Sequence, residues 1–112
     1  MKNVYWTKEI DATLIVSDEN ATVIEMNDKA SKVFESDGKK VGTKLLDCHP
    51  TWAKPKVEEL MNVKKPSCYT TEKDGNSNFV YHTPWFENGE YKGLVELIIP
   101  LPKEMPHYVR DE

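Results

Sequence analysis

Residues 79–99 read FVYHTPWFENGEYKGLVELII, and this stretch decides the fold. Two runs rich in β-branched and aromatic residues, 79–86 and 91–99, flank the dipeptide Asn88-Gly89. Asn-Gly is the strongest short signal for a two-residue hairpin turn, because both residues tolerate positive φ angles. The stretch therefore predicts a long antiparallel hairpin in the C-terminal part of the chain.

The last strand of this hairpin has two distinct faces. Strict alternation places Val95, Leu97 and Ile99 on one face and Leu94 and Glu96 on the other. The charge of Glu96 predicts that its face is at least partly solvated.

Three further β-rich runs extend this pattern. Residues 67–73 precede the turn dipeptide Asp74-Gly75, which adds a third strand to the C-terminal hairpin. Residues 12–16 and 22–26 flank the polar turn 18–20 and predict a separate hairpin near the N-terminal end.

Two helices are predicted between these groups of strands. Asn27 is a good N-cap for the first helix, a plain capping role being the favoured interpretation, and Pro55 suits the first turn of the second. Apolar residues at i, i+3 and i+4 mark the buried face of each helix. These residues are Ala30, Val33 and Phe34 in the first helix and Val57, Leu60 and Met61 in the second.

The order of these elements predicts an α+β fold, a five-stranded antiparallel sheet with short helices packed on one face. The first hairpin must pair with the last strands, so the helical segment crosses over the sheet and leaves a space beneath it. We assign residues 11–102 to this domain. Residues 1–10 form a lead-in with one or two expected helical turns, and residues 103–112 form a polar tail.

Composition restricts the function. The chain has 112 residues and a formal net charge of −4, which argues against a nucleic-acid partner because such a partner requires a basic surface. No apolar run approaches the ~18 residues of a membrane span, and the N-terminus lacks the features of a signal peptide. We therefore expect a cytoplasmic protein of one domain, without a membrane partner.

The middle of the chain reads LLDCHP at residues 45–50, with Trp52 just beyond. Cys48 and His49 form the only adjacent thiol and imidazole, but neighbours in sequence usually point apart, whereas a nucleophilic pair must be apposed in space. The chain also lacks a phosphate-binding loop, a dinucleotide-type glycine pattern and a glycine-flanked serine. We therefore expect no enzymatic activity.

Taken in order, these features resemble a PAS domain from end to end. The matching residues are the first hairpin, Met26-Asn27 with Ala30 and Phe34, the segment 41–47, and the closing hairpins. The chain is most similar to small bacterial PAS sensor proteins, often stand-alone, with a Cys-His element after Leu-Leu-Asp. They also share the hairpin residues 84–86, 89–91 and 93–96 and the tail 105–107.

This resemblance implies a sensory or interaction module. PAS domains bind haem, flavin or small metabolites between helices and sheet, or bind nothing, and commonly dimerise and pass a signal to an effector. No effector fits within 112 residues. If the chain is a complete protein, the expected partners are a second copy of the chain, in a homodimer, or a separate signalling protein.

The candidate ligand-contacting residues come from the crossover and the sheet. They are Cys48, His49 and Trp52 on the crossover, and Tyr81 and Trp85 on the hairpin, although the sequence leaves open which sheet face points inward. Haem is one candidate cofactor, because Cys or His can be its axial ligand, and His49 is a metal ligand only if haem is bound. The Asn-Cys-Arg helix of light-sensing flavin relatives is absent.

The alternative function is a ligand-free interaction module that acts through dimerisation. It rests on Tyr5-Trp6 in the lead-in and on the outer face of the sheet.

Overall fold

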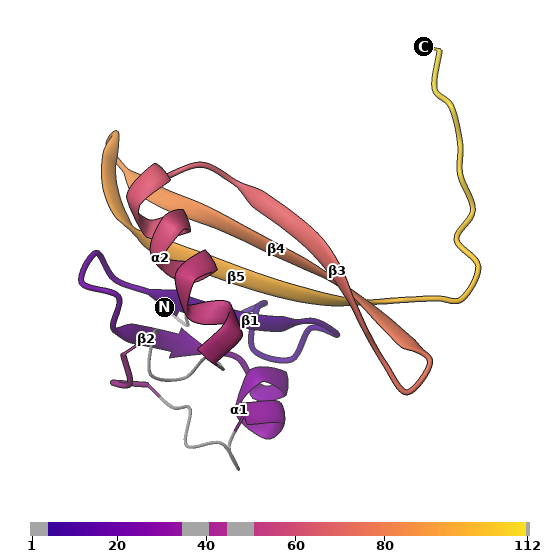
Figure 1. Ribbon diagram of the computed structural model, residues 1–112, viewed down its shortest axis with the longest axis horizontal. Helices are drawn as coiled ribbons and strands as arrows, with labels where there is room; N and C mark the ends of the chain where they lie inside the picture. Colours follow the sequence, from indigo (N-terminus) through magenta and orange to yellow (C-terminus); the bar gives the residue numbers. More distant parts are fainter. Residues whose placement is uncertain (1–4, 35–40, 45–50, 112) are drawn as a thin grey trace.

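The computed structural model describes residues 5–34, 41–44 and 51–111 (Figure 1). The elements are β1 (Thr13–Ser17), β2 (Val23–Met26), α1 (Asp28–Phe34), η3 (Thr51–Ala53), α2 (Lys54–Val63), β3 (Ser67–Lys73), β4 (Asn76–Glu87) and β5 (Glu90–Leu101). The strands β4 and β5 are longer than predicted, because their pairing continues past both ends of the apolar runs. None of the helices in the described ranges is long and apolar enough to cross a membrane.

The strands form one antiparallel sheet in the order β2-β1-β5-β4-β3. Its centre is the pairing of β1 with β5, which sets Thr13 opposite Ile98 and Val16 opposite Val95. The N-terminal and C-terminal hairpins therefore join into a single sheet, and the predicted fold class is confirmed.

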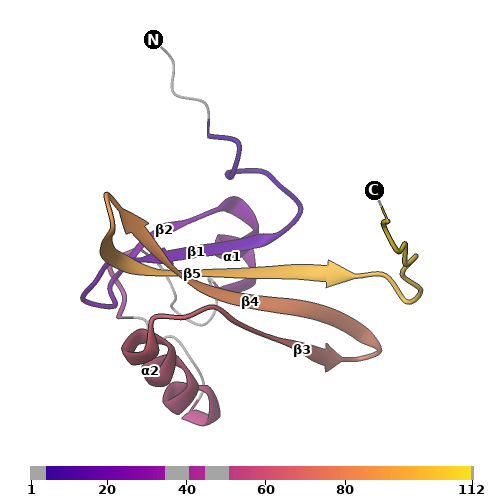
Figure 2. The same cartoon turned by 90° about the horizontal axis from the view of Figure 1, so that it is seen from above.

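The core lies between the helices and one face of this sheet, and Figure 2 shows α2 on one side of the ribbon formed by β3, β4 and β5. On the predicted apolar face of α2, Val57 and Leu60 are buried. The helix ends at Lys64, which has a left-handed backbone conformation and donates its N–H to the Leu60 carbonyl at 3.0 Å. The core residues are Ile15, Ala21, Val23, Ala30, Val57, Leu60 and Leu94.

The inward face of β5 is the one that carries Glu96. Leu94 and Glu96 are buried, whereas Leu97 is half-buried and Ile99 exposed, so the prediction of a partly solvated face, which rested on Glu96, was wrong at that residue. The charge misled the prediction because Glu96 lies directly across from a second buried polar residue, His82, on β4. A buried polar pair can therefore share a face with the hydrophobic core.

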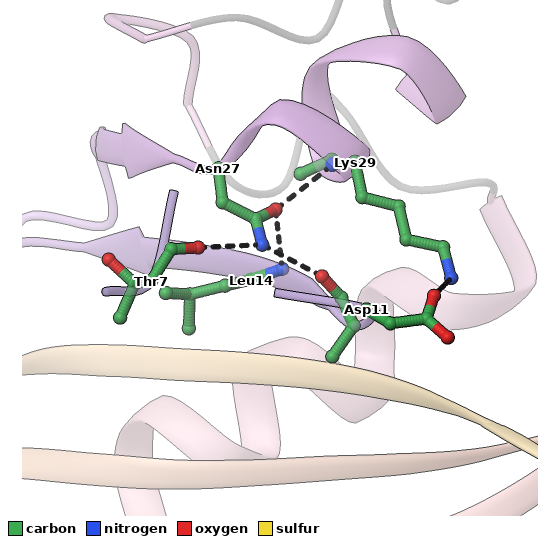
Figure 3. Close-up of polar contacts among 7 residues, drawn as sticks. Thr7, Asp11, Leu14, Asn27 and Lys29 are labelled. Atoms are coloured by element: carbon green, nitrogen blue, oxygen red, sulfur yellow. Dashed lines mark hydrogen bonds and ion pairs between the residues drawn. The ribbon is translucent and has the colours of Figure 1, made fainter. Parts of the chain in front are cut away.

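Asn27 joins three segments of the N-terminal half (Figure 3). Its Oδ1 accepts hydrogen bonds from Ala30 N (3.0 Å), which caps α1, and from Leu14 N (3.1 Å) in β1. Its Nδ2 donates to the carbonyls of Thr7 (3.1 Å) and Ala12 (2.7 Å). The predicted capping role is confirmed, and the same buried side chain also fixes the lead-in to the sheet.

These bonds explain a difference from the prediction in the lead-in. Residues 5–12 form turns and bends up to the start of β1, and none of them is helical. The Thr7 and Ala12 carbonyls accept from Asn27, and the Lys8 carbonyl accepts from Asp28 N at 2.9 Å. Carbonyls that a helix would use are therefore bonded to α1 and its cap instead.

A second junction links the end of β1 to the hairpin of β4 and β5. Ser17 Oγ accepts from Leu94 N at 3.2 Å, and the Ser17 carbonyl accepts from the indole Nε1 of Trp85 at 3.0 Å. Gly93 lies directly against this backbone, with φ of 148°. A Cβ at Gly93 would overlap the Ser17 carbonyl oxygen and lie 2.7 Å from its carbon, so this approach requires glycine.

Candidate functional site

A cavity of about 320 Å³ lies between the helices and the inward face of the sheet. The helical side is formed by α1 and η3, and the sheet side by β1, β3, β4 and β5. The volume is at the lower end of the range typical of small-molecule sites. The described lining residues are Thr13, Lys29, Val33, Phe34, Trp52, Ala53, Tyr69, Thr71, Asn78, Val80, Glu96, Ile98 and Pro100.

A buried acid–imidazole pair lies at the sheet wall. Glu96 lines the cavity although it is only 7% exposed, and His82, 1% exposed, is its direct cross-strand neighbour. The Glu96 Oε2 is 3.5 Å from the His82 Nε2. This separation exceeds the 2.7–2.9 Å of a charge-assisted hydrogen bond, and neither ring nitrogen of His82 has a hydrogen-bond partner among the described residues.

Tyr69 on β3 lies next to His82 on β4, so that three neighbouring strands contribute polar side chains here. Its ring centroid lies 5.8 Å from that of His82, and it also lines the cavity. Burial raises the pKa of the Tyr69 phenol above its ordinary value, and the charge of Glu96 raises this pKa further. Both causes favour the neutral phenol, which can donate a hydrogen bond into the cavity.

We expect Tyr69 to contribute to alkaline instability. The folded-state pKa is raised, so the stability from this group is complete below its ordinary pKa of 10.0 and is lost as the pH rises through the folded-state value. Urea unfolding at a series of alkaline pH values should show a shallower decline for Tyr69→Phe than for the unmodified protein. Tyr108→Phe, in the exposed tail, is the control; a decline equally steep in Tyr69→Phe would contradict this expectation.

The described lining of the cavity includes one cation and one exposed aromatic ring. Lys29 on α1 lines the cavity, and its Nζ pairs with the Asp11 Oδ1 at 2.7 Å. Trp52 on η3 is largely exposed and also lines the cavity. The Asp11 carboxylate offsets the Lys29 charge, whereas the lining acid Glu96 is buried.

The structure brings Trp52 to this cavity, but not the other described candidates. Tyr81 is on the opposite face of β4, where it pairs with Leu97 and stacks on Phe79 with ring centroids 6.2 Å apart. Trp85 is bonded to the Ser17 carbonyl. Neither residue lines the cavity. Strand β4 contributes Asn78 and Val80 to the lining instead.

Cys48 and His49 lie outside the described residues, so their proposed ligand contacts stay predictions. The haem hypothesis depends on them. Haem needs an axial ligand, typically His, Cys or Met, and none of these residue types occurs among the described residues that line the cavity. The described part of the wall therefore does not by itself fit a haem.

The described residues also contain no group of three or more His, Cys, Asp or Glu side chains arranged to hold a metal ion. Cys68, for its part, is an exposed free thiol on β3 rather than a small buried side chain. What the described site offers chemically is recognition, through a buried carboxylate, a neutral phenol and apolar walls.

Comparison with known proteins identifies the fold. No family model and no curated protein matches the sequence. Among solved structures, however, the chain is similar to PAS domains, and the chain has the PAS fold.

Three of these structures illustrate the likeness. The PAS domain of BvgS from Bordetella pertussis has a TM-score of 0.64 at 17% identity, over 83% of this chain and 79% of that one. The PAS domain of the histidine kinase ThkA has a TM-score of 0.60 at 21% identity, over 79% and 98%. Aer2 from Vibrio cholerae, described as a dual PAS-heme oxygen sensor, has a TM-score of 0.57 at 14% identity, over 81% and 95%.

Proposed function

We propose that the chain is a sensory PAS module that binds a small organic molecule in the cavity between α1, η3 and the sheet. The observation that carries this proposal is the cavity itself, about 320 Å³ in volume and lined by apolar and polar side chains, among them a buried carboxylate. Polar groups set among apolar side chains are typical of sites that orient a ligand. The proposed role is binding and signalling, and it includes no catalysed reaction.

Similar structures support a sensory role. ThkA is a histidine kinase and Aer2 a haem-based oxygen sensor, as their descriptions state. Both descriptions therefore connect a PAS domain with a sensor or signalling protein. By analogy, we propose that occupancy of the cavity is passed on to a second copy of the chain or to a separate signalling protein in the cytoplasm.

Filling the cavity tests the proposal. Val33 on α1 lines the cavity and is 51% exposed, so Val33→Trp should fold normally yet occupy ligand space. Val63 on α2 is 49% exposed and does not line the cavity, which makes Val63→Trp the matched control. Native mass spectrometry after gentle purification should show a bound small molecule in the unmodified protein and in Val63→Trp, and at least about tenfold less in Val33→Trp.

Two results would contradict the proposal. One is equal occupancy of the three proteins, which would place the bound molecule elsewhere. The other is the absence of any bound molecule from protein purified out of cell extracts in which haem and metabolites are abundant. The same spectra report a haem mass directly, and thereby test the His49 hypothesis.

A second candidate function, dimerisation, is favoured by the outer face of the sheet. This face carries the stacked rings of Phe79 and Tyr81, flanked by Leu97 and the exposed Ile99. Apolar groups gathered on an exposed face indicate an interaction surface. Sedimentation at micromolar concentration distinguishes a monomer from a dimer, and a strict monomer would count against this function.

A further inference from the structure

We propose that the ligand of this cavity is a flat, uncharged ring that accepts a hydrogen bond from the Tyr69 phenol at its edge. This inference rests on the proposed function and specifies the ligand class. It is carried by the order of the side chains along the sheet wall and by the hydrogen-bonding groups of the described lining.

One row of side chains crosses four strands of the sheet wall. Tyr69 lies opposite Val80, Val80 opposite Ile98, and Ile98 opposite Thr13. All four residues line the cavity. Neighbouring strands lie about 4.8 Å apart, so the phenol-bearing and hydroxyl-bearing ends of the row are about 14 Å apart at the backbone. The row therefore has an apolar centre and a polar residue at each end.

The helical side of the cavity adds a second apolar wall. Its described members include Val33 and Phe34 from α1 and Trp52 and Ala53 from η3. A flat ring between the two walls would bury both of its faces, and aromatic side chains favour offset or edge contacts with such a ring. A volume of about 320 Å³ suits a ligand of one or two fused rings.

The Tyr69 phenol is a hydrogen-bond donor that the described part of the protein does not use. Its ring contacts that of His82, with centroids 5.8 Å apart, but its hydroxyl makes no hydrogen bond to any described residue. Burial raises the pKa of this phenol above its ordinary value, so the hydroxyl keeps its proton at neutral pH. A ligand atom with a lone pair, such as a ring nitrogen or a carbonyl oxygen, would accept from it.

The described lining favours an uncharged acceptor at this place. Lys29 is the cation among the described lining residues, and its Nζ already pairs with the Asp11 Oδ1 at 2.7 Å. An anion is costly to bury without a close cation of its own. A cationic nitrogen, for its part, has no lone pair with which to accept from the phenol. The acceptor that fits Tyr69 therefore carries no charge.

Two probes of nearly the same shape isolate the contribution of the acceptor. Indole and indazole are flat two-ring molecules with one N–H each, and indazole has a ring nitrogen with a lone pair where indole has a C–H. NMR titration should show indazole binding about threefold to tenfold more tightly than indole, the factor expected for one net hydrogen bond between neutral groups.

Removal of the phenol hydroxyl should abolish this difference. In Tyr69→Phe the affinities of the two probes should agree to within about twofold, because the ring remains and only the donor is lost. Tyr81→Phe is the matched control, since it removes a hydroxyl from the opposite face of β4, outside the cavity, and should keep the preference for indazole. A merely structural role of Tyr69 would weaken both probes alike.

A second readout needs no variant for its result. With isotope-labelled tyrosine, the NMR signals of the Tyr69 ring should shift more with indazole than with indole, whereas those of Tyr81 should respond equally to the two probes. Tyr69→Phe serves here to assign the Tyr69 signals, and circular dichroism establishes that both variants are folded.

Each outcome decides the inference. Tighter binding of indazole, lost in Tyr69→Phe and kept in Tyr81→Phe, supports it. Equal affinities in the unmodified protein, a preference that survives in Tyr69→Phe, equal weakening of both probes in that variant, or no binding of either probe overturns it. The proposed function is judged separately, by the molecule that co-purifies with the protein and by its loss in Val33→Trp, so the two can fail independently.

Discussion

Replacing Gly93 by alanine is expected to remove most of the stability of the fold. The new methyl group would overlap the Ser17 carbonyl oxygen and lie 2.7 Å from its carbon, and both belong to backbone that cannot move aside as a flexible side chain would. The φ angle of 148° adds strain for any residue with a Cβ. Moving this backbone would also break the bonds that Ser17 makes with Leu94 and Trp85.

We expect a loss of more than about 4 kcal/mol, which is a large part of the total for a domain of this size. Urea unfolding followed by circular dichroism measures it. Gly75→Ala is the matched control, because Gly75 also has a positive φ, +79°, but open space around it. That control should lose only about 1 kcal/mol. If Gly93→Ala and Gly75→Ala were equally stable, the close approach of Gly93 to the Ser17 backbone would contribute little to the stability of the fold.

Asn27→Ala is expected to be nearly as damaging, through polar groups rather than overlap. The amide makes four hydrogen bonds to backbone groups and is only 3% exposed. Alanine would leave the Leu14 and Ala30 N–H groups and the Thr7 and Ala12 carbonyls without this partner (Figure 3). A buried group left unpaired costs about 1–3 kcal/mol, and water can reach some of these four.

The expected total is about 3–5 kcal/mol, again measured by urea unfolding. Asn62→Ala, on the exposed surface of α2, is the control and should change the free energy of unfolding by less than about 0.5 kcal/mol. Hydrogen exchange adds a local readout, since the amide of Leu14 should lose protection in Asn27→Ala. Retention of that protection with an unchanged unfolding midpoint would refute the role assigned to Asn27.

Much of the fold could be predicted because the relevant signals are local. The Asn88-Gly89 dipeptide specifies a hairpin, Asn27 and Pro55 mark helix starts, and apolar spacing identifies the helix faces. The joining of both hairpins into one sheet followed from the need to bury their apolar faces together. These inferences required no knowledge of which distant atoms meet.

The key pair of the site could not be predicted in the same way. A plain two-residue turn at Asn88-Gly89 sets Glu87 opposite Glu90, and continuing that register would place Val95 opposite His82. A bulge between Trp85 and Phe86 shifts the register by one residue, so Glu96 meets His82 instead. The bulge lies where Gly93 packs on Ser17, and that contact joins positions far apart in the chain.

The orientation of the sheet faces was a second limit. The prediction of Tyr81 and Trp85 as ligand contacts rests on their aromatic rings, but both alternating faces of β4 contain rings, and the sequence does not indicate which face points inward. The inward face turned out to be the one with His82 and Glu96, two polar residues. The sequence does contain a signal for this face, because His82 and Glu96 are polar residues within otherwise apolar strands. This signal becomes informative only when the register that pairs the two residues is known.

The central position of the pairing between β1 and β5 also bears on how the domain assembles in time. Strands β3, β4 and β5 are joined by two consecutive hairpins. Pairing between neighbouring strands therefore closes only short loops of the chain and can form early. Thr13 and Ile98, by contrast, come from opposite ends of the chain, and bringing them together orders most of the intervening sequence. Because folding slows as contacts become less local, docking of β1 onto β5 is the expected rate-limiting event. Strand β5 must therefore have left the ribosome before the pairing of β1 with β5, and with it the sheet wall of the cavity, can form.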